Sequence, residues 1–215
     1  MRREAFAGGW YCDCVPSGAY VVLMKDSHLE TDRGRVELPQ AQNLLYVRMS
    51  PNGIAFAGAG HRDDRVWEWT GLFWQDRGSA FGVSPVIYDR NGVLHMNDGS
   101  WGSQGARYVD AWNRVVTGDE TYFSPDMELS EWSEVFLSIC VGQSHPDGTN
   151  DTAWIYDDQD THRLLEPGPC RFIRATREGE QTSIAIWEPR QGSLLCWPTL
   201  AELRALPIAP PVLPA

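Results

Sequence analysis

The stretch LLYVRMSPNGIAFAGAGHRDDRVWEWTGLFWQDRG, from Leu44 to Gly78 of a 215-residue chain, decides the fold. Short apolar and aromatic runs alternate in it with turn residues, and none of these runs has helical spacing. The tetrapeptide Ser50-Pro51-Asn52-Gly53 separates the run LLYVRM from the run IAFAGA. Asn-Gly between two such runs is the strongest short signal of a β-hairpin. The segments RVWEWTG and LFWQD predict a second strand pair directly after it.

The same alternation continues in both directions along the chain. Asn91-Gly92 separates PVIYD from VLHMN, and three further turns are expected at Gly8-Gly9, Glu178-Gly179 and Gln191-Gly192. Helical spacing of apolar residues occurs only in TLAELRAL, from Thr199 to Leu206, which is too short to carry a fold. Short strand-like runs between turns are typical of an all-β protein.

Strand pairs recur along the chain at a nearly regular spacing. AYVVLMKD with GRVELP, RVWEWTG with LFWQD, and ARYVDAW with RVVTGD are the clearest, and TAWIYDD with HRLLEP and SIAIWEP with SLLCWP follow. Their starts at Ala19, Arg65, Ala106, Thr152 and Ser183 are 46, 41, 46 and 31 residues apart. A period in the forties with four short strands per unit is typical of β-propeller blades.

We therefore predict an all-β, β-propeller-like fold with four or five blades of short antiparallel strands. Five blades result if the N-terminal segment EAFAGGWYCDC is a hairpin that begins the first blade. A β-sandwich with evenly spaced strands is the alternative. Residues 1–206 form a single domain in this interpretation, and residues 207–215 form a Pro-rich extended arm. The segment from Leu206 to Ala215 contains four prolines, so it does not join a central strand.

Charge and cysteine content exclude several classes of partner. The net charge of −11 repels nucleic acid and anionic membrane surfaces. No apolar run reaches the roughly 18 residues that span a bilayer, and no signal peptide is expected, so the chain is predicted to be made in the cytoplasm. Cys12 and Cys14 share one face of a predicted strand, and the five cysteines of the chain are interpreted as reduced and mostly buried, with a metal site as the alternative. No metal and no cofactor are expected.

The hairpins resemble a known repeat. The turns Pro51-Asn52-Gly53 and Asn91-Gly92, with Trp67 and Trp69 downstream of the first, resemble the blades of tachylectin-like five-bladed propellers. The Gly-Gly-Trp of those lectins occurs here once, at Gly8-Gly9-Trp10, and not in each blade. The resemblance implies a recognition propeller without catalytic activity.

Two groups of residues are candidates for ligand binding. Trp67 and Trp69 lie two apart on a predicted strand, so they share one face and Glu68 faces the other way. Packing between blades is the favoured interpretation of these rings, and a ligand platform that includes Arg65 is the alternative. The stronger candidate is the Gly-rich loop MNDGSWGSQGAR, which places polar side chains beside one ring. Its candidate residues are Asn97, Asp98, Ser100, Trp101 and Gln104.

No catalytic motif is complete, so no catalytic residue is predicted. The segment SHPDGTNDTAW, from Ser144 to Trp154, approaches the Asp-box of sialidases but has the wrong spacing. We predict a non-catalytic binding or structural propeller, made in a bacterial cytoplasm and mounted on a phage virion as a tail, baseplate or capsid accessory protein. It would recognise a carbohydrate or a protein surface and contact virion or assembly proteins through the segment from Leu206 to Ala215. A free carbohydrate-binding lectin is the first alternative, and a glycoside hydrolase or sialidase-like enzyme is the second.

Overall fold

A computed structural model describes most of the chain. The described residues are 1–25, 28–39, 44–60, 65–79, 86–88, 91–97, 107–110, 115–117, 138–141, 152–156, 162–166, 172–188 and 192–208. Within these ranges the strands form five antiparallel sheets, which we number as blades 1 to 5, and one short helix follows the last strand. The predicted all-β, propeller-like fold is confirmed.

Each blade is a meander of neighbouring strands. Blade 1 contains β2 (Gly9–Cys14), β3 (Tyr20–Met24), β4 (His28–Thr31) and β5 (Gly34–Glu37). Blade 2 contains β6 (Leu44–Met49), β7 (Phe56–Gly60), β8 (Arg65–Trp69) and β9 (Trp74–Ser79). Blade 3 contains β10 (Val86–Tyr88), β11 (Leu94–Asn97), β12 (Arg107–Asp110) and β13 (Val115–Thr117). Blade 4 contains β14 (Ser138–Val141), β15 (Thr152–Tyr156) and β16 (His162–Glu166). Blade 5 contains β17 (Phe172–Glu178), β18 (Gln181–Glu188), β19 (Gly192–Trp197) and β1 (Arg2–Phe6), and the helix is α2 (Leu200–Arg204).

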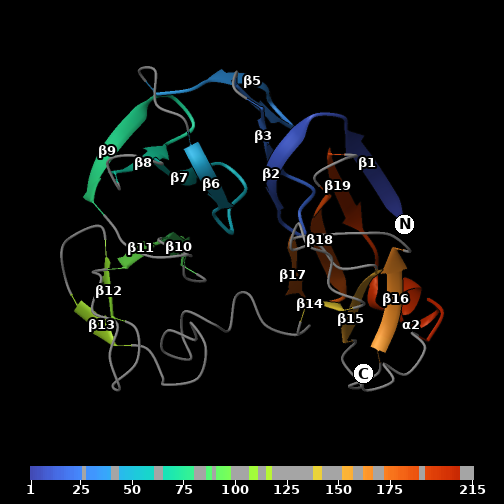
Figure 1. Cartoon of the computed structure of the whole chain (residues 1–215). Helices are drawn as coiled ribbons and strands as arrows, with labels where there is room; N and C mark the ends of the chain where they lie inside the picture. Colours follow the sequence, from blue (N-terminus) through green and yellow to red (C-terminus); the bar gives the residue numbers. More distant parts are fainter. Residues whose placement is uncertain are drawn as a thin grey trace.

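The blades follow one another around a ring in chain order (Figure 1). The first strand of one blade contacts that of the next in several places, as β2 does with β6 and β14 with β17. Among the described residues, three apolar clusters fill spaces between blades. One lies between blades 1 and 2, the second between blades 2 and 3, and the third between blades 1 and 5. The core of this molecule is therefore divided among the blade interfaces.

The chain closes the ring by pairing its first strand with its last. β1 is antiparallel to β19, with Arg2 opposite Trp197 and Phe6 opposite Ser193. The predicted hairpin at Gly8-Gly9 is therefore wrong, because β1 belongs to blade 5 whereas β2 pairs with β3 in blade 1. The turn at Gly8 carries the chain from one sheet to the next. The local sequence shows a turn between two strands but does not show which partner each strand takes.

The predicted spacing of the repeats is close to the observed spacing, but the predicted starts do not coincide with the first strands of the blades. The blades begin at Gly9, Leu44, Val86, Ser138 and Phe172, which gives steps of 35, 42, 52 and 34 residues. The starts inferred from sequence mix second strands, such as β3 and β18, with third strands, such as β8 and β12. The short strand β4 was also missed, since AYVVLMKD pairs with β4 and not directly with GRVELP. Apolar and polar residues alternate in the same way in all of these hairpins, so the pattern does not show which position a strand takes within its sheet.

Local turn chemistry was predicted more accurately. The turn at Ser50-Pro51-Asn52-Gly53 connects β6 to β7, and the backbone N–H of Gly53 donates to the Ser50 carbonyl at 2.9 Å. Asn52 Oδ1 accepts from the backbone N–H of Ile54 at 2.8 Å, so β7 begins at Phe56, two residues later than the apolar run. Helix α2 falls in the predicted segment, and Thr199 caps it with a capping box that includes Glu202.

Three buried cysteines lie on strands of blades 1 and 5. Cys12 and Cys14 on β2 and Cys196 on β19 are buried and form no disulfide, as expected. Burial raises the pKa of the Cys12 thiol to about 12, and it raises the pKa of Cys14 well above its ordinary value. Both thiols therefore stay protonated in the folded protein at neutral pH.

These thiols make the protein sensitive to alkali. The folded-state pKa of Cys12 is raised from 9.0 to about 12. The contribution of the protonated thiol to the unfolding free energy is therefore fully present below pH 9 and is lost as the pH rises toward 12. The loss is about 1.4 kcal/mol of unfolding free energy per pH unit for one thiol. We expect Cys12→Ala to show a shallower decline of stability between pH 9 and 10.5, measured by urea unfolding under reducing conditions. The same pH dependence in both proteins would contradict this assignment.

Candidate binding site between blades 1 and 2

The predicted binding loop lies almost entirely outside the described residues. Asp98, Ser100, Trp101 and Gln104 are not among them. Asn97 is the last residue of β11, where it stands opposite Tyr108 of β12. Binding by this loop therefore stays a prediction.

The structure places Trp67 and Trp69 on β8, where both rings are half-buried against the cluster between blades 1 and 2. Trp69 stacks on Phe56 with ring centroids 6.3 Å apart and meets Trp74 edge-on at 5.6 Å. Glu68 faces the other way and accepts a hydrogen bond from Tyr88 of blade 3. The two tryptophans thus pack at an interface between blades, and their part in binding a ligand stays a prediction.

Arg65, the third candidate of this group, is exposed at the start of β8. It forms an ion pair with Asp76 of β9, and its hydrogen bond is the largest cause that lowers the pKa of that carboxyl. It does not line the cavity described next.

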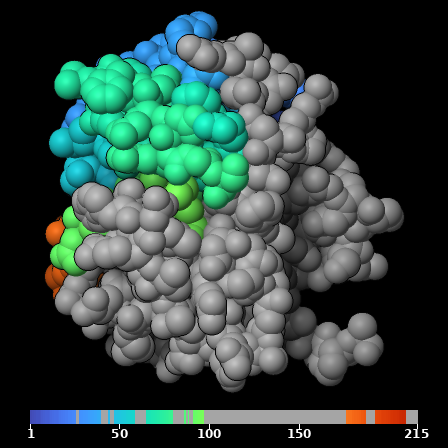
Figure 2. All heavy atoms as spheres, turned by 90° about the vertical axis from the view of Figure 1, so that its left-hand side faces the viewer, coloured from blue at the N-terminus to red at the C-terminus, as the bar shows by residue number. Residues whose placement is uncertain are grey.

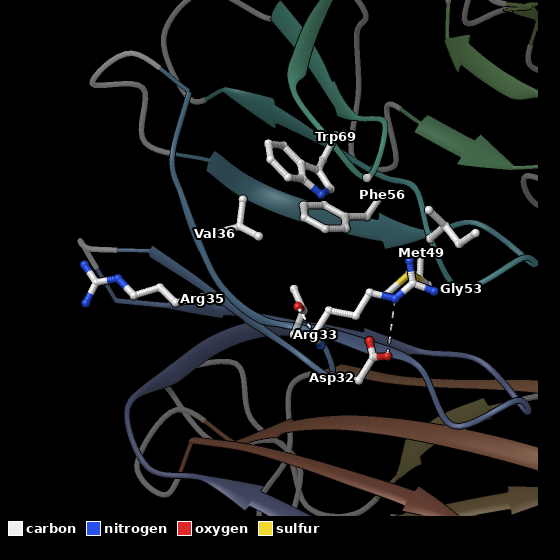
Figure 3. A pocket seen from close by; sticks show the side chains of 11 residues that line it. Asp32, Arg33, Arg35, Val36, Met49, Gly53, Phe56 and Trp69 are labelled. Atoms are coloured by element: carbon white, nitrogen blue, oxygen red, sulfur yellow. Dashed lines mark hydrogen bonds and ion pairs between the residues drawn. The ribbon is translucent and has the colours of Figure 1, made fainter.

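A cavity of about 180 Å³ opens between blades 1 and 2. Three turns surround it: the β4–β5 turn with Asp32 and Arg33, the β6–β7 turn with Gly53 and Ile54, and the β8–β9 turn with Gly71. Its walls are the side chains of both blades, seen from close by in Figure 3. The lining residues are Thr31, Asp32, Arg33, Arg35, Val36, Met49, Gly53, Ile54, Phe56, Trp69 and Gly71.

The inner walls of the cavity are apolar and firmly held. Met49 and Phe56 are fully buried members of the cluster between the blades, and Val36 and Trp69 pack against it. The indole N–H of Trp74, which supports Trp69 from behind, donates to the Glu37 carbonyl at 2.8 Å. This bond joins β9 to β5 and so fixes the outer strands of the two blades to each other. The cavity is a preformed feature of the blade interface.

Three exposed apolar side chains lie beside the cavity, and we call them the apolar rim: Ile54, Leu72 and Phe73. They are 42%, 84% and 58% exposed. Leu72 and Phe73 belong to the β8–β9 turn, which is closed by the Thr70 N–H donating to the Phe73 carbonyl at 3.1 Å. Ile54 touches this turn, since its Cγ2 lies 2.7 Å from the place of a Cβ on Gly71. In Figure 2 the surface of blade 2 adjoins that of blade 1 on this side of the molecule.

Polar groups occur only toward one side of the cavity mouth among its lining residues. The Thr31 hydroxyl donates to the Gly34 carbonyl at 2.7 Å, and Nε of Arg33 lies 3.8 Å from Oδ2 of Asp32. The Arg33 side chain extends along the cavity toward Gly53, whereas Arg35 points away from it (Figure 3). The site therefore combines apolar inner walls, an apolar rim and a polar side of the mouth, where Asp32 and the Arg33 guanidinium lie.

Of the residues selected from the sequence, only Trp69 lines this cavity. The others that build it are turn residues, which a local pattern identifies merely as turns. One signal was available: the segment TGLFWQD places Leu72 and Phe73, two large apolar residues, within a tight turn. Turns are ordinarily polar, so two adjacent exposed apolar residues there are candidates for a contact surface.

Comparison with known proteins gives weak likenesses only. The chain matches no protein-family model, and no curated protein matches it. Among solved structures, a Bacteroides fragilis protein described as exported is similar at 10% identity and a TM-score of 0.42, over 93% of this chain and 70% of the other. An auxiliary nutrient binding protein from Bacteroides thetaiotaomicron is similar at 13% identity and a TM-score of 0.38, over 88% and 57%. A chain of a nidogen/laminin complex is similar at 13% identity and a TM-score of 0.36, over 92% and 77%.

At these TM-scores the likenesses carry no argument about what this chain binds, and the propeller fold rests on its own strand pairing. Within the described ranges, no helix is long and apolar enough to cross a bilayer. The same ranges contain no cluster of three or more His, Cys, Asp or Glu residues able to hold a metal ion.

Proposed function

We propose that this propeller is a non-catalytic recognition protein that binds another protein by taking up one of its apolar side chains. The observation that carries the proposal is the pairing of a cavity whose inner walls are apolar with an exposed apolar rim. Leu72, at 84% exposure, contributes nothing to the core and lies where a partner would cover it. Binding energy in protein interfaces concentrates in a few side chains that fill pockets, and neighbouring apolar contacts exclude water from them.

The size of the cavity supports a side chain as its occupant. At about 180 Å³ it is smaller than the roughly 300–1,000 Å³ of sites for drug-sized ligands. Its inner walls are apolar, so they suit a hydrocarbon group, and its polar side chains, Asp32 and Arg33 among them, are confined to one side of the mouth. Sugar binding in the manner of tachylectin-like propellers remains the runner-up proposal, with the Gly-rich loop around Trp101 as its site.

A peptide selection tests the two proposals against each other. A yeast-displayed library of random peptides would be selected against the full chain and, in parallel, against Val36→Phe, which narrows the cavity. We expect peptides with one large apolar residue to be enriched by the native chain and lost with the variant. If Val36→Phe does not fold, Ile54→Trp gives the same comparison, because it places a larger side chain at an exposed part of the cavity lining and so also narrows the cavity. A glycan-array signal that survives both substitutions, without any enriched peptide, would favour the lectin.

A surface substitution gives a second test of the same site. We expect Leu72→Asp and Phe73→Asp to change the unfolding free energy by no more than about 0.5 kcal/mol, because both side chains are exposed. Both should nevertheless weaken the selected peptides at least tenfold in a fluorescence-anisotropy titration, since each places a charge on the apolar rim. Arg65→Asp, on the same blade but away from the cavity, is the control and should bind as the native chain does.

The wider setting predicted from the sequence stays a prediction. A place on a phage tail, baseplate or capsid is consistent with a recognition protein that binds protein surfaces. The identity of the neighbouring genes tests it, since capsid or tail genes would support a virion and carbohydrate-active enzymes would favour the glycan-processing alternative. The proposed arm from Pro207 to Ala215 is described only as far as Ile208, which is 67% exposed.

A further inference from the structure

The mouth of the cavity carries a guanidinium whose capacity for hydrogen bonding is unused within the described part of the chain. Arg33 is 56% exposed, and its one side-chain contact there is the ion pair from Nε to Oδ2 of Asp32 at 3.8 Å. That separation is too long for a hydrogen bond. A guanidinium presents five N–H donors in a planar fork that matches the two oxygens of a carboxylate.

The neighbouring arginine differs in both direction and partner. Nε of Arg35 donates to Glu37 Oε1 at 2.7 Å, and Figure 3 shows its side chain directed away from the cavity. Arg33, in contrast, extends over the cavity toward Gly53. Both residues belong to the cavity lining, but only Arg33 directs its guanidinium along the cavity.

The contact between Arg33 and Asp32 does not prevent Arg33 from binding a ligand. It joins exposed groups at long range, and such pairs contribute little to stability. Asp32 has a second partner, because its Oδ1 accepts from the Tyr20 backbone N–H at 3.4 Å. Arg33 can therefore turn from Asp32 to an incoming carboxylate at small cost.

We propose, on the basis of the function proposed above, that the partner segment carries a carboxylate beside the apolar side chain that enters the cavity. Arg33 binds that carboxylate as a two-point ion pair while Met49, Phe56 and Trp69 enclose the apolar group. Charge-assisted pairs of this geometry are the strong ones, and they add direction to an otherwise apolar contact. The partner is thus a protein segment with Asp or Glu next to a large aliphatic or aromatic residue.

The net charge of −11 does not oppose this assignment at contact range. At physiological ionic strength, interactions between exposed charges fall off over about 8 Å. A carboxylate at the mouth of the cavity therefore responds mainly to the two nearest charges, the attraction of Arg33 at hydrogen-bonding distance and the opposing charge of Asp32, and less to acidic groups elsewhere on the ring. The overall charge restricts the partner to a segment with few acidic residues, because a strongly acidic one is repelled during approach.

Two small probes of equal shape test the proposal. N-acetyl-L-leucine and N-acetyl-L-leucinamide share the apolar side chain and differ in the carboxylate. Each probe would be titrated into the full chain, and binding would be monitored by the NMR signal of the Met49 methyl group. That signal is assigned by its absence from the spectrum of Met49→Leu. We expect the carboxylate probe to bind at least fivefold more tightly than the amide. Arg33→Gln should abolish that preference, and Arg65→Gln, at an arginine outside the cavity lining, should retain it.

The outcomes separate this inference from the function on which it rests. Equal binding of the two probes, with Met49 perturbed by both, overturns the carboxylate and leaves the apolar cavity as a binding site. A preference that persists in Arg33→Gln overturns the role of Arg33. If neither probe perturbs Met49 while a peptide selection also fails, the proposed function itself is lost. Arg33 is exposed, so Arg33→Gln is expected to fold, which circular dichroism would verify.

Discussion

Gly192→Ala is expected to lower the unfolding free energy by about 3–5 kcal/mol, because it forces apart the two strands that close the ring. Gly192 begins β19 with φ at +102°, a conformation that L side chains rarely adopt. A Cβ at this position would lie 2.1 Å from the carbonyl oxygen of Phe6, the last residue of β1. The atom in its way belongs to the backbone, so relief requires β1 to move away from β19.

Gly34→Ala is the matched control for this substitution. Gly34 has a similar φ of +112°, but a Cβ there would meet nothing within 4 Å. The control therefore carries the conformational cost alone, about 1–2 kcal/mol. Urea unfolding of both variants would give the difference, which measures the closure contact. Equal losses in the two variants would show that β1 yields freely and that ring closure adds little to stability.

The same closure marks the boundary of what the sequence can predict. Asn52-Gly53 and Thr199 act through atoms a few residues away, so the turn and the helix cap could be predicted from local chemistry. The pairing of Arg2 with Trp197 joins residues at the two ends of the chain. Nothing in either segment selects the other, because any two amphipathic strands of this length can pair. That choice is made by the geometry of the whole ring.

In the candidate site, too, the local features could be predicted from the sequence and the contacts between distant segments could not. Period-2 alternation placed Trp67 and Trp69 on one face and Glu68 on the other, and the structure agrees. It did not show that turns of two neighbouring blades would meet around a cavity. Asp32 and Ile54 approach that cavity from different sheets, so their sequence positions give no sign of a common site. Leu72 and Phe73 were the available signal, because exposed apolar residues in a turn have no structural purpose within the blade.

Glu68→Ala is expected to cost about 3–4 kcal/mol of unfolding free energy, because the carboxylate joins blades 2 and 3 in a buried network. Glu68 is 6% exposed, its Oε1 accepts from the Tyr88 hydroxyl at 2.8 Å, and its Oε2 accepts from Arg77 Nε at 2.7 Å. Burial, followed by the charge of Glu68, raises the pKa of Tyr88, so the phenol remains a donor at neutral pH. Removing the carboxylate leaves a buried hydroxyl and a largely buried guanidinium without their acceptor.

Glu37→Ala removes a carboxylate of the same kind from the surface. Glu37 also accepts from an arginine, Arg35, but its side chain is 71% exposed, so the loss should not exceed about 0.5 kcal/mol.

Tyr88→Phe should cost about 1–2 kcal/mol alone and much less in the Glu68→Ala background, since the two groups share one bond. Urea unfolding of the native chain, Glu68→Ala, Tyr88→Phe and the double variant tests this double-mutant cycle. Strictly additive losses for Glu68 and Tyr88 would contradict a shared network and would mean that each residue stabilises its own blade.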